Sequence, residues 1–154
     1  MAVLKEGDPA PAIDAVDQNG QKITLKEFRG RKVVLYFYPK DNTPGCTAEA
    51  CDLRDHYSQF IDQGFEVIGV SADSEKSHQK FITKYELPFR LIADVDKKVL
   101  KDYWAWGEKK LYGKVFMGVR RKTFVINTDG IIERIIEKVN TKEHSTQIFE
   151  QLSH

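Results

Sequence analysis

The fold depends on the segment KVVLYFYPKDNTPGCTAEACDLRDHYSQFI, residues 32–61, which contains a transition from a strand to a helix. Its first part, residues 32–38, is almost continuously apolar and β-branched or aromatic, which is typical of a strand covered on both faces. Thr43 and Pro44 then offer an N-cap and a first helical residue. Apolar residues recur at helical spacing until Gly64 provides a stop. The stretch therefore predicts a buried strand followed by a helix.

Further strands and helices alternate on both sides of this unit. Asn19-Gly20 lies between two short alternating runs and predicts an early hairpin. Asn127 to Gly130 predicts a second hairpin near the end of the chain. The other expected elements are strands at 65–70, 89–93, 123–126 and 131–139, helices at 74–85 and 96–104, and a last helix opened by a capping box at 140–143.

The order of these elements is βαβαβαββα, preceded by the early hairpin. Alternation of this kind predicts an α/β fold with a central, mostly parallel sheet and helices on both faces. The order is similar to a thioredoxin-like fold with an extra N-terminal β-hairpin. No repeat, low-complexity tract or linker interrupts the sequence, so we expect a single domain over residues 1–154.

The composition excludes several classes of protein. With 24 Lys+Arg against 23 Asp+Glu, and 41% hydrophobic residues, the chain is typical of a globular domain and gives no basic footprint for nucleic acid. The longest apolar run, residues 33–38, is far shorter than the roughly 18 residues of a membrane span. Residues 1–6 show neither a basic nor an apolar leader region, so we expect a cytoplasmic protein without membrane contact.

Cys46 occupies the first turn of the expected helix, just beyond the carboxyl end of a buried strand. Ligands and chemistry collect at such edges of open α/β sheets. The unpaired N–H groups and the positive end of the helix dipole favour a thiolate there. The alternative is an inert core cysteine that packs as a small hydrophobe. Thr43-Pro44-Gly45 directly ahead favours the reactive interpretation.

Cys51 follows five positions later, about 140° around an ideal helix and ~7.5 Å along it. The two Cα atoms would then lie roughly 8–9 Å apart, whereas a disulfide rarely tolerates more than about 7 Å. If the two cysteines react with each other, the helix must unwind first. Cys46 shares the apolar stripe, whereas Cys51 lies on the polar flank with Arg54 and Asp55. The alternative is that Cys51 is a partly buried cysteine that takes no part in the reaction.

The sequence gives less support to other kinds of cysteine chemistry and to a metal site. Four residues separate the cysteines, so the Cys-x-x-Cys motif of thioredoxin-type oxidoreductases is absent. His56 and His78 lack the paired spacing of a zinc site, and we expect no metal. All four histidines, including His144 and His154, are interpreted as surface residues. Glycine-rich phosphate loops are absent, and we expect no cofactor.

Aromatic residues gather in the segment that follows the third expected helix. Trp104, Trp106, Tyr112 and Phe116 are candidates for a hydrophobic patch near the site. Ordinary packing over the edge of the sheet is the favoured interpretation.

The segment YPKDNTPGCTAEAC, residues 38–51, carries a specific resemblance. It matches the Pro-x-x-x-Thr-x-x-Cys pattern and resembles the active-site segment of peroxiredoxins. With a second cysteine five residues on, it resembles the Q-type subgroup, the bacterioferritin comigratory protein class. The likeness covers essentially the whole chain and continues through VSADS at 70–74, WGEKK at 106–110 and GVRRKTF at 118–124.

The resemblance implies a role for each matching residue. Cys46 would be the peroxidatic cysteine and Cys51 the resolving one, joined as a redox disulfide during turnover. Pro39 would shield the thiolate and shape the pocket. Thr43 would hydrogen-bond the peroxide oxygens. Arg121 would face the thiolate.

Arg120 is a neighbouring competitor for the role of the active-site arginine. Side chains alternate along a strand, so Arg121 shares a face with Thr123, whereas Arg120 does not. We therefore favour Arg121. Glu49, one turn after Cys46, would position that arginine, with a solvated helix carboxylate as the alternative.

The activity implied is that of a thiol-dependent peroxidase in antioxidant defence. It would reduce hydrogen peroxide and organic hydroperoxides through a sulfenic acid on Cys46, which Cys51 captures as a disulfide. A thioredoxin-like dithiol protein would recycle the disulfide. The resemblance also implies a monomer without cofactors. The alternatives are a thiol–disulfide exchange protein that uses no peroxide and a non-catalytic redox-sensing domain.

Overall fold

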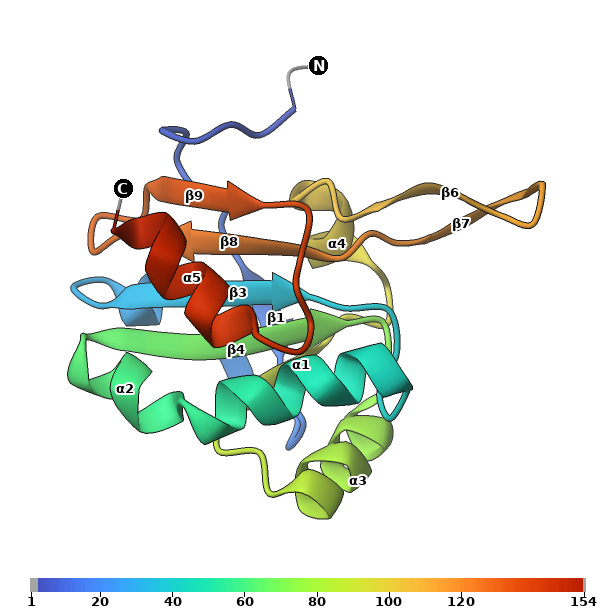
Figure 1. Ribbon diagram of the computed structural model, residues 1–154, viewed down its shortest axis with the longest axis horizontal. Coiled ribbons are helices and arrows are strands. Elements are labelled where there is room, and N and C mark those ends of the chain that lie inside the picture. Colours follow the sequence, from blue (N-terminus) through green and yellow to red (C-terminus); the bar gives the residue numbers. More distant parts are fainter. Residues whose placement is uncertain (1–2, 154) are drawn as a thin grey trace.

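A central five-stranded sheet organises the protein, whose computed structural model describes residues 3–153 (Figure 1). The strand order is β5-β4-β3-β8-β9, and β8 runs antiparallel to both of its neighbours, while β3, β4 and β5 are parallel. The expected α/β architecture with a mostly parallel sheet is confirmed. The strands are β3 (Lys32–Phe37), β4 (Phe65–Ser71), β5 (Arg90–Ala93), β8 (Lys122–Ile126) and β9 (Ile132–Ile136).

Helices cover both faces of this sheet. The helices α1, α2, α3 and α5 pack on one face, and α4 packs on the other with the early hairpin. No helix within residues 3–153 is long and apolar enough to cross a membrane. The helices are α1 (Pro44–Asp55), α2 (Tyr57–Asp62), α3 (Glu75–Tyr85), α4 (Lys98–Asp102) and α5 (His144–Leu152), with a short 3-10 helix at Leu25–Phe28.

The position of strand β3 between two layers explains why its sequence is continuously apolar. Val33, Leu35 and Phe37 enter the core on the side of α4. Val34 and Tyr36 enter the core on the side of α1. Because successive side chains of a strand point to opposite faces, a strand between two layers of helices has no face left for polar residues.

The early hairpin forms as predicted, from β1 (Asp14–Val16) and β2 (Lys22–Thr24). The hairpin predicted at Asn127 to Gly130 joins the antiparallel strands β8 and β9. A further hairpin, β6 (Trp106–Leu111) and β7 (Lys114–Val119), was not predicted and projects from the body of the molecule (Figure 1). Tyr112 and Gly113 join its strands with positive φ angles of 51° and 77°, as a type I′ turn requires.

This hairpin corrects the expectation for the aromatic segment. Trp106 packs against the core at the base of the hairpin. Tyr112 and Phe116 are exposed, at 96% and 44%, so they do not pack over the edge of the central sheet. The physical reason is that β6 and β7 pair with each other and extend away from the sheet.

Three helices have bounds that differ from the sequence-based prediction, and the one expected at 96–104 spans only Lys98–Asp102. The helix expected to continue to Gly64 breaks at His56, whose ring Nδ1 lies 2.9 Å from the Asp52 carbonyl oxygen. The last helix begins at residue 144, without a capping box. The Asn140 side chain instead accepts the N–H groups of residues 142 and 143 in a turn before the helix.

Candidate active site

Cys46 lies at the start of α1, where the chain leaves the carboxyl end of β3. Thr43 is the N-cap and Pro44 the first helical residue, as predicted. The helical ladder begins with the Thr47 N–H donating to the Thr43 carbonyl at 2.8 Å, so the Gly45 and Cys46 amides precede it. The Cys46 side chain is buried, with 1% exposure. The fold thus holds a thiol in a dry site at the positive end of a helix.

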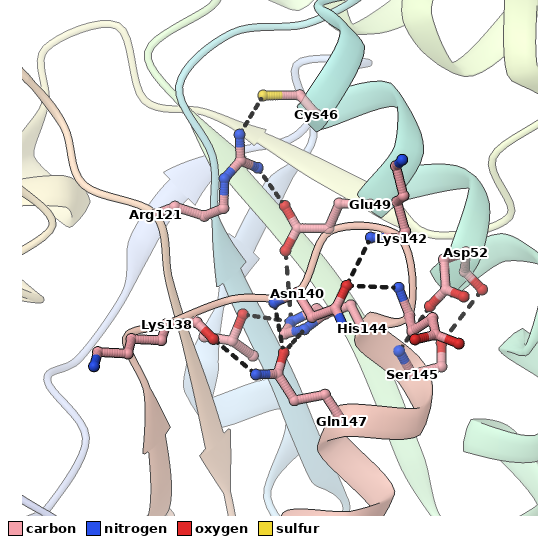
Figure 2. Close-up of polar contacts among 12 residues, drawn as sticks. Cys46, Glu49, Asp52, Arg121, Lys138, Asn140, Lys142, His144, Ser145 and Gln147 are labelled. Atoms are coloured by element: carbon pink, nitrogen blue, oxygen red, sulfur yellow. Dashed lines mark hydrogen bonds and ion pairs between the residues drawn. The ribbon is translucent and has the colours of Figure 1, made fainter. Parts of the chain in front are cut away.

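Arg121 joins this sulfur to a carboxylate. Its Nη2 donates to Cys46 Sγ at 3.3 Å, and its Nη1 donates to Glu49 Oε1 at 2.6 Å (Figure 2). Burial disfavours charge on the guanidinium, but Glu49 and Cys46 outweigh burial and raise the pKa of Arg121 above its ordinary value. Arg121 therefore stays positively charged beside the sulfur.

The structure places Arg121, and not Arg120, at the sulfur. Arg120 is exposed, and its Nη2 donates to the Glu108 carbonyl of the projecting hairpin at 3.0 Å. Gly45 borders the guanidinium, because a Cβ atom there would lie in ordinary contact with Arg121 Nη2, at 3.4 Å.

Glu49 is fully buried one turn after Cys46, so the alternative of a solvated helix carboxylate is wrong. Burial raises the pKa of Glu49 to about 7; Arg121 opposes this increase and Asp52 adds to it. One carboxyl oxygen accepts from Arg121, while the other, Oε2, has no hydrogen-bond partner in the structure. That second oxygen lies 3.5 Å from His144 Nε2.

The interpretation of all four histidines as surface residues is wrong for two of them. His78 and His144 have 0% exposure, and His56 is half-buried, while His154 lies outside the described residues. Each buried ring has polar partners at both nitrogens, which is what permits its burial. No pattern in the local sequence distinguishes such a residue from a surface histidine.

His78 anchors the loop that leads into α1. Its Nδ1 lies 2.7 Å from Asp41 Oδ2, and its Nε2 lies 2.8 Å from the Ile92 carbonyl oxygen. Asp41 also accepts from the Tyr38 and Ser77 hydroxyls. Sequence reasoning missed this cluster, which ties the loop before Cys46 to α3 and β5.

Thr43 and Pro39 lie on the same loop. The Thr43 hydroxyl donates to the Lys40 carbonyl at 2.8 Å. Its oxygen can therefore accept a hydrogen bond from a bound molecule, while its own hydrogen is already engaged. Both Thr43 and Pro39 are half-buried, immediately ahead of the helix that carries Cys46.

Both cysteines are free thiols, and Cys51 is half-buried within the same unbroken helix as Cys46. This is the reduced arrangement, in which helical geometry keeps the two Cα atoms too far apart for a disulfide. Any bond between them requires the first turns of α1 to open.

Comparison with known proteins agrees with this geometry. Residues 6–135 match the model of the AhpC/TSA family. The "Putative peroxiredoxin bcp" of Helicobacter pylori (strain J99) is 45% identical over 152 residues, covering 99% of this chain and 100% of the relative. The Escherichia coli K12 "Peroxiredoxin Bcp" is 40% identical over 144 residues, covering 94% and 92%.

Solved structures give the same result. A mutant of Xylella fastidiosa PrxQ superimposes with a TM-score of 0.91 at 30% identity, covering 99% of this chain and 98% of that one. A Xanthomonas campestris bacterioferritin comigratory protein, described for its alkyl peroxide reduction activity, superimposes with a TM-score of 0.85 at 33% identity, covering 92% of this chain and 90% of that one. The chain therefore belongs to the AhpC/TSA family, among the peroxiredoxins of the Bcp or Q type.

Proposed function

We propose that this protein is a thiol peroxidase that reduces hydrogen peroxide and organic hydroperoxides through Cys46. The observation that carries the proposal is the contact of 3.3 Å between the Arg121 guanidinium and Cys46 Sγ at the N-terminus of α1. A buried thiolate needs fixed positive groups, and this one has a guanidinium and a helix N-terminus. The alkyl peroxide reduction described for the Xanthomonas campestris relative supports the same chemistry.

In the first step, the Cys46 thiolate attacks one oxygen of the peroxide. The S–O bond forms as the O–O bond breaks, and the departing oxygen takes up a proton and leaves as water or an alcohol. Arg121 donates toward the site where negative charge moves from sulfur to oxygen. Thr43 accepts a hydrogen bond from the peroxide hydroxyl, and Pro39 keeps water from the sulfur.

In the second step, the Cys51 sulfur attacks the Cys46 sulfenic acid. An S–S bond forms and water leaves, so the two thiols supply the two electrons that the peroxide has taken. The helix opens to permit this and refolds after reduction. A thioredoxin-like dithiol protein then reduces the disulfide by thiol exchange and becomes oxidised itself. We further propose a cytoplasmic monomer in which residues 1–154 act as one domain without a cofactor.

Rapid mixing of the reduced protein with peroxide tests the proposal. We expect Cys46→Ser to abolish peroxide consumption. We expect Cys51→Ser to allow one turnover and then to stall as Cys46 oxidises further. If wild type exchanges disulfides with a dithiol protein but does not react with peroxide, the alternative of a thiol–disulfide exchange protein holds. Oxidation by peroxide without turnover in the presence of a thioredoxin system would instead indicate a redox sensor.

A further inference from the structure

Behind Arg121, the buried carboxyl of Glu49 faces a second titratable group. Glu49 Oε2 lies 3.5 Å from His144 Nε2, and both side chains have 0% exposure (Figure 2). Oε2 has no hydrogen-bond partner, although burying such an atom unpaired costs about 1–3 kcal/mol or more. Whether the contact between Glu49 and His144 stabilises or destabilises the site therefore depends on whether one of the two side chains carries a proton there.

The surroundings of His144 determine which of its nitrogens carries a hydrogen. The Gln147 amide nitrogen donates to the Lys138 carbonyl at 2.8 Å, and its Oε1 accepts from the Asn140 N–H at 2.8 Å. His144 Nδ1 lies 2.9 Å from that same Oε1, which can only accept. Nδ1 therefore carries a hydrogen, and in a neutral ring the single lone pair of Nε2 faces both the Thr123 hydroxyl, at 2.7 Å, and Glu49 Oε2, at 3.5 Å.

Without a further proton, an anionic oxygen would face this lone pair in a site closed to water. One added proton resolves the conflict, on Glu49 Oε2 or on His144 Nε2. With the proton on Nε2, the Thr123 hydroxyl 2.7 Å away accepts a hydrogen bond from it; with the proton on Glu49, Thr123 donates to Nε2 and shares its single lone pair with the Glu49 hydroxyl. A single proton between the two side chains is thus the arrangement that the fixed neighbours favour.

We propose that Glu49 and His144 share one proton at neutral pH. The pair then carries no net charge, and the positive charge of Arg121 acts mainly on the Cys46 thiolate. His144 is then a positioning residue that acts on Arg121 through Glu49. This inference rests on the proposed peroxidase function, and it adds a pH-sensitive pair to that site. Loss of the shared proton would give Arg121 a second full anion to neutralise, at 2.6 Å on Nη1.

The other groups that face Glu49 favour retention of the proton. Asp52 on α1 adds negative charge, and Tyr36 on β3 is a buried phenol, whereas Arg121 is the cation among residues 3–153 that opposes protonation of Glu49. Burial raises the pKa of Glu49 to about 7 and lowers the pKa of His144 to about 4. The shared proton therefore resides mainly on Glu49.

The direct test is an NMR titration of the reduced full-length protein with ¹³C-carboxyl glutamate and ¹⁵N-histidine labels. We expect Glu49 to titrate near neutral pH, with the His144 ring responding at the same midpoint, and Glu49→Gln to remove that response. A Glu49 carboxylate that is already ionised at pH 5.5, beside a neutral His144, would overturn the proposal. This measurement does not depend on peroxidase activity.

The functional test is the pH profile of Cys46 oxidation by hydrogen peroxide. As the pair loses its proton, the wild-type rate constant should fall on the order of threefold, because a second anion weakens the field at the sulfur. Glu49→Gln should remove this descending step. His144→Gln, which presents a non-titrating donor to the Glu49 carboxylate, should keep the step but move it to lower pH.

His56→Gln is the matched control, since His56 is a half-buried histidine at the end of α1 that contacts Asp52 and not Glu49. It should keep the wild-type profile. A descending step that persists in Glu49→Gln would overturn the role of the pair. If no variant, and no wild-type protein, reacts with peroxide, then the proposed function fails while the NMR titration still decides the proton sharing.

Discussion

Arg121 uses two different nitrogens of one planar group to contact a sulfur and a carboxylate. A lysine could not reproduce this, because its ammonium acts as a single point of charge. Glu49 on α1 holds the guanidinium through an ion pair of 2.6 Å, while Arg121 itself comes from the segment just before β8. The reactivity of Cys46 therefore depends on one residue that lies 75 positions away in the sequence.

Arg121→Met should lower the rate of Cys46 oxidation by peroxide about 10²-fold, the loss typical of one fixed donor to a developing charge. Stopped-flow mixing of the reduced variants measures this rate. Arg120→Met is the control and should react as wild type, because Arg120 donates to the exposed hairpin. Equal losses in the two variants would contradict the assignment of Arg121.

Glu49 predicts a specific dependence of stability on pH. Its pKa of about 7 in the folded protein lies above the ordinary value of 4.5, so the folded state favours the protonated form. Its stabilising contribution is fully present below pH 4.5 and is lost as pH rises through 7, a change on the order of 3 kcal/mol.

Urea unfolding of wild type and Glu49→Gln at pH 5 and pH 8 measures this loss. The glutamine variant should gain stability relative to wild type as pH rises, since it has no charge to bury. An identical pH dependence in the two proteins would show that Glu49 is already ionised in the folded state at pH 5.

At the scale of elements, α1 must change shape during the proposed cycle. Its amides at residues 47–51 should be protected from hydrogen exchange in the reduced protein and should lose that protection after oxidation by peroxide. The reason is that a disulfide between Cys46 and Cys51 cannot form on an intact helix. Exchange followed by mass spectrometry measures the change, and Cys51→Ser is the control that should stay protected. Protection that survives disulfide formation would contradict the unwinding.

The elements that the sequence predicted are those with strong local signals. Strand β3 has an unbroken apolar run, and Thr43-Pro44 marks the start of α1. The hairpin of β6 and β7 was missed because its strands are rich in lysine and exposed residues, and because Tyr112-Gly113 is a rarer turn than Asn-Gly. The start of α5 was misplaced because Asn140 forms a turn of its own, although its sequence fits a capping box.

At the scale of the molecule, buried polar clusters connect distant segments to the loop and helix around Cys46. His78 and Asp41 join this loop to α3 and to the carbonyl of Ile92 on β5. Asp52 accepts the N–H of Ser145 at 2.7 Å and so joins α1 to α5. These contacts tie α1 and the loop before it to α3, β5 and α5.

His78→Ala should lower the free energy of unfolding by about 3–5 kcal/mol, because it leaves the Asp41 carboxyl buried without its ring partner. Denaturant unfolding measures the loss. His56→Ala, at a half-buried position, should cost less than about 1 kcal/mol. Equal small losses would show that the loop does not depend on His78.

How much of the site could be predicted depends on how far apart its residues lie in the sequence. Cys46, Cys51, Thr43 and Glu49 lie within one short motif, and their placement on one loop and helix could be predicted from it. His144 could not, because it reaches Glu49 from a helix at the other end of the chain, where its sequence context is that of a surface residue. Such contacts depend on how α5 packs over the sheet, which no local pattern encodes.

The most direct test of the account is to trap the first intermediate. Reduced Cys51→Ser protein is mixed with one equivalent of hydrogen peroxide, quenched with a reagent specific for sulfenic acid, and mapped by peptide mass spectrometry. The account predicts a near-stoichiometric adduct on Cys46. Unconsumed peroxide with an unmodified Cys46 would contradict it.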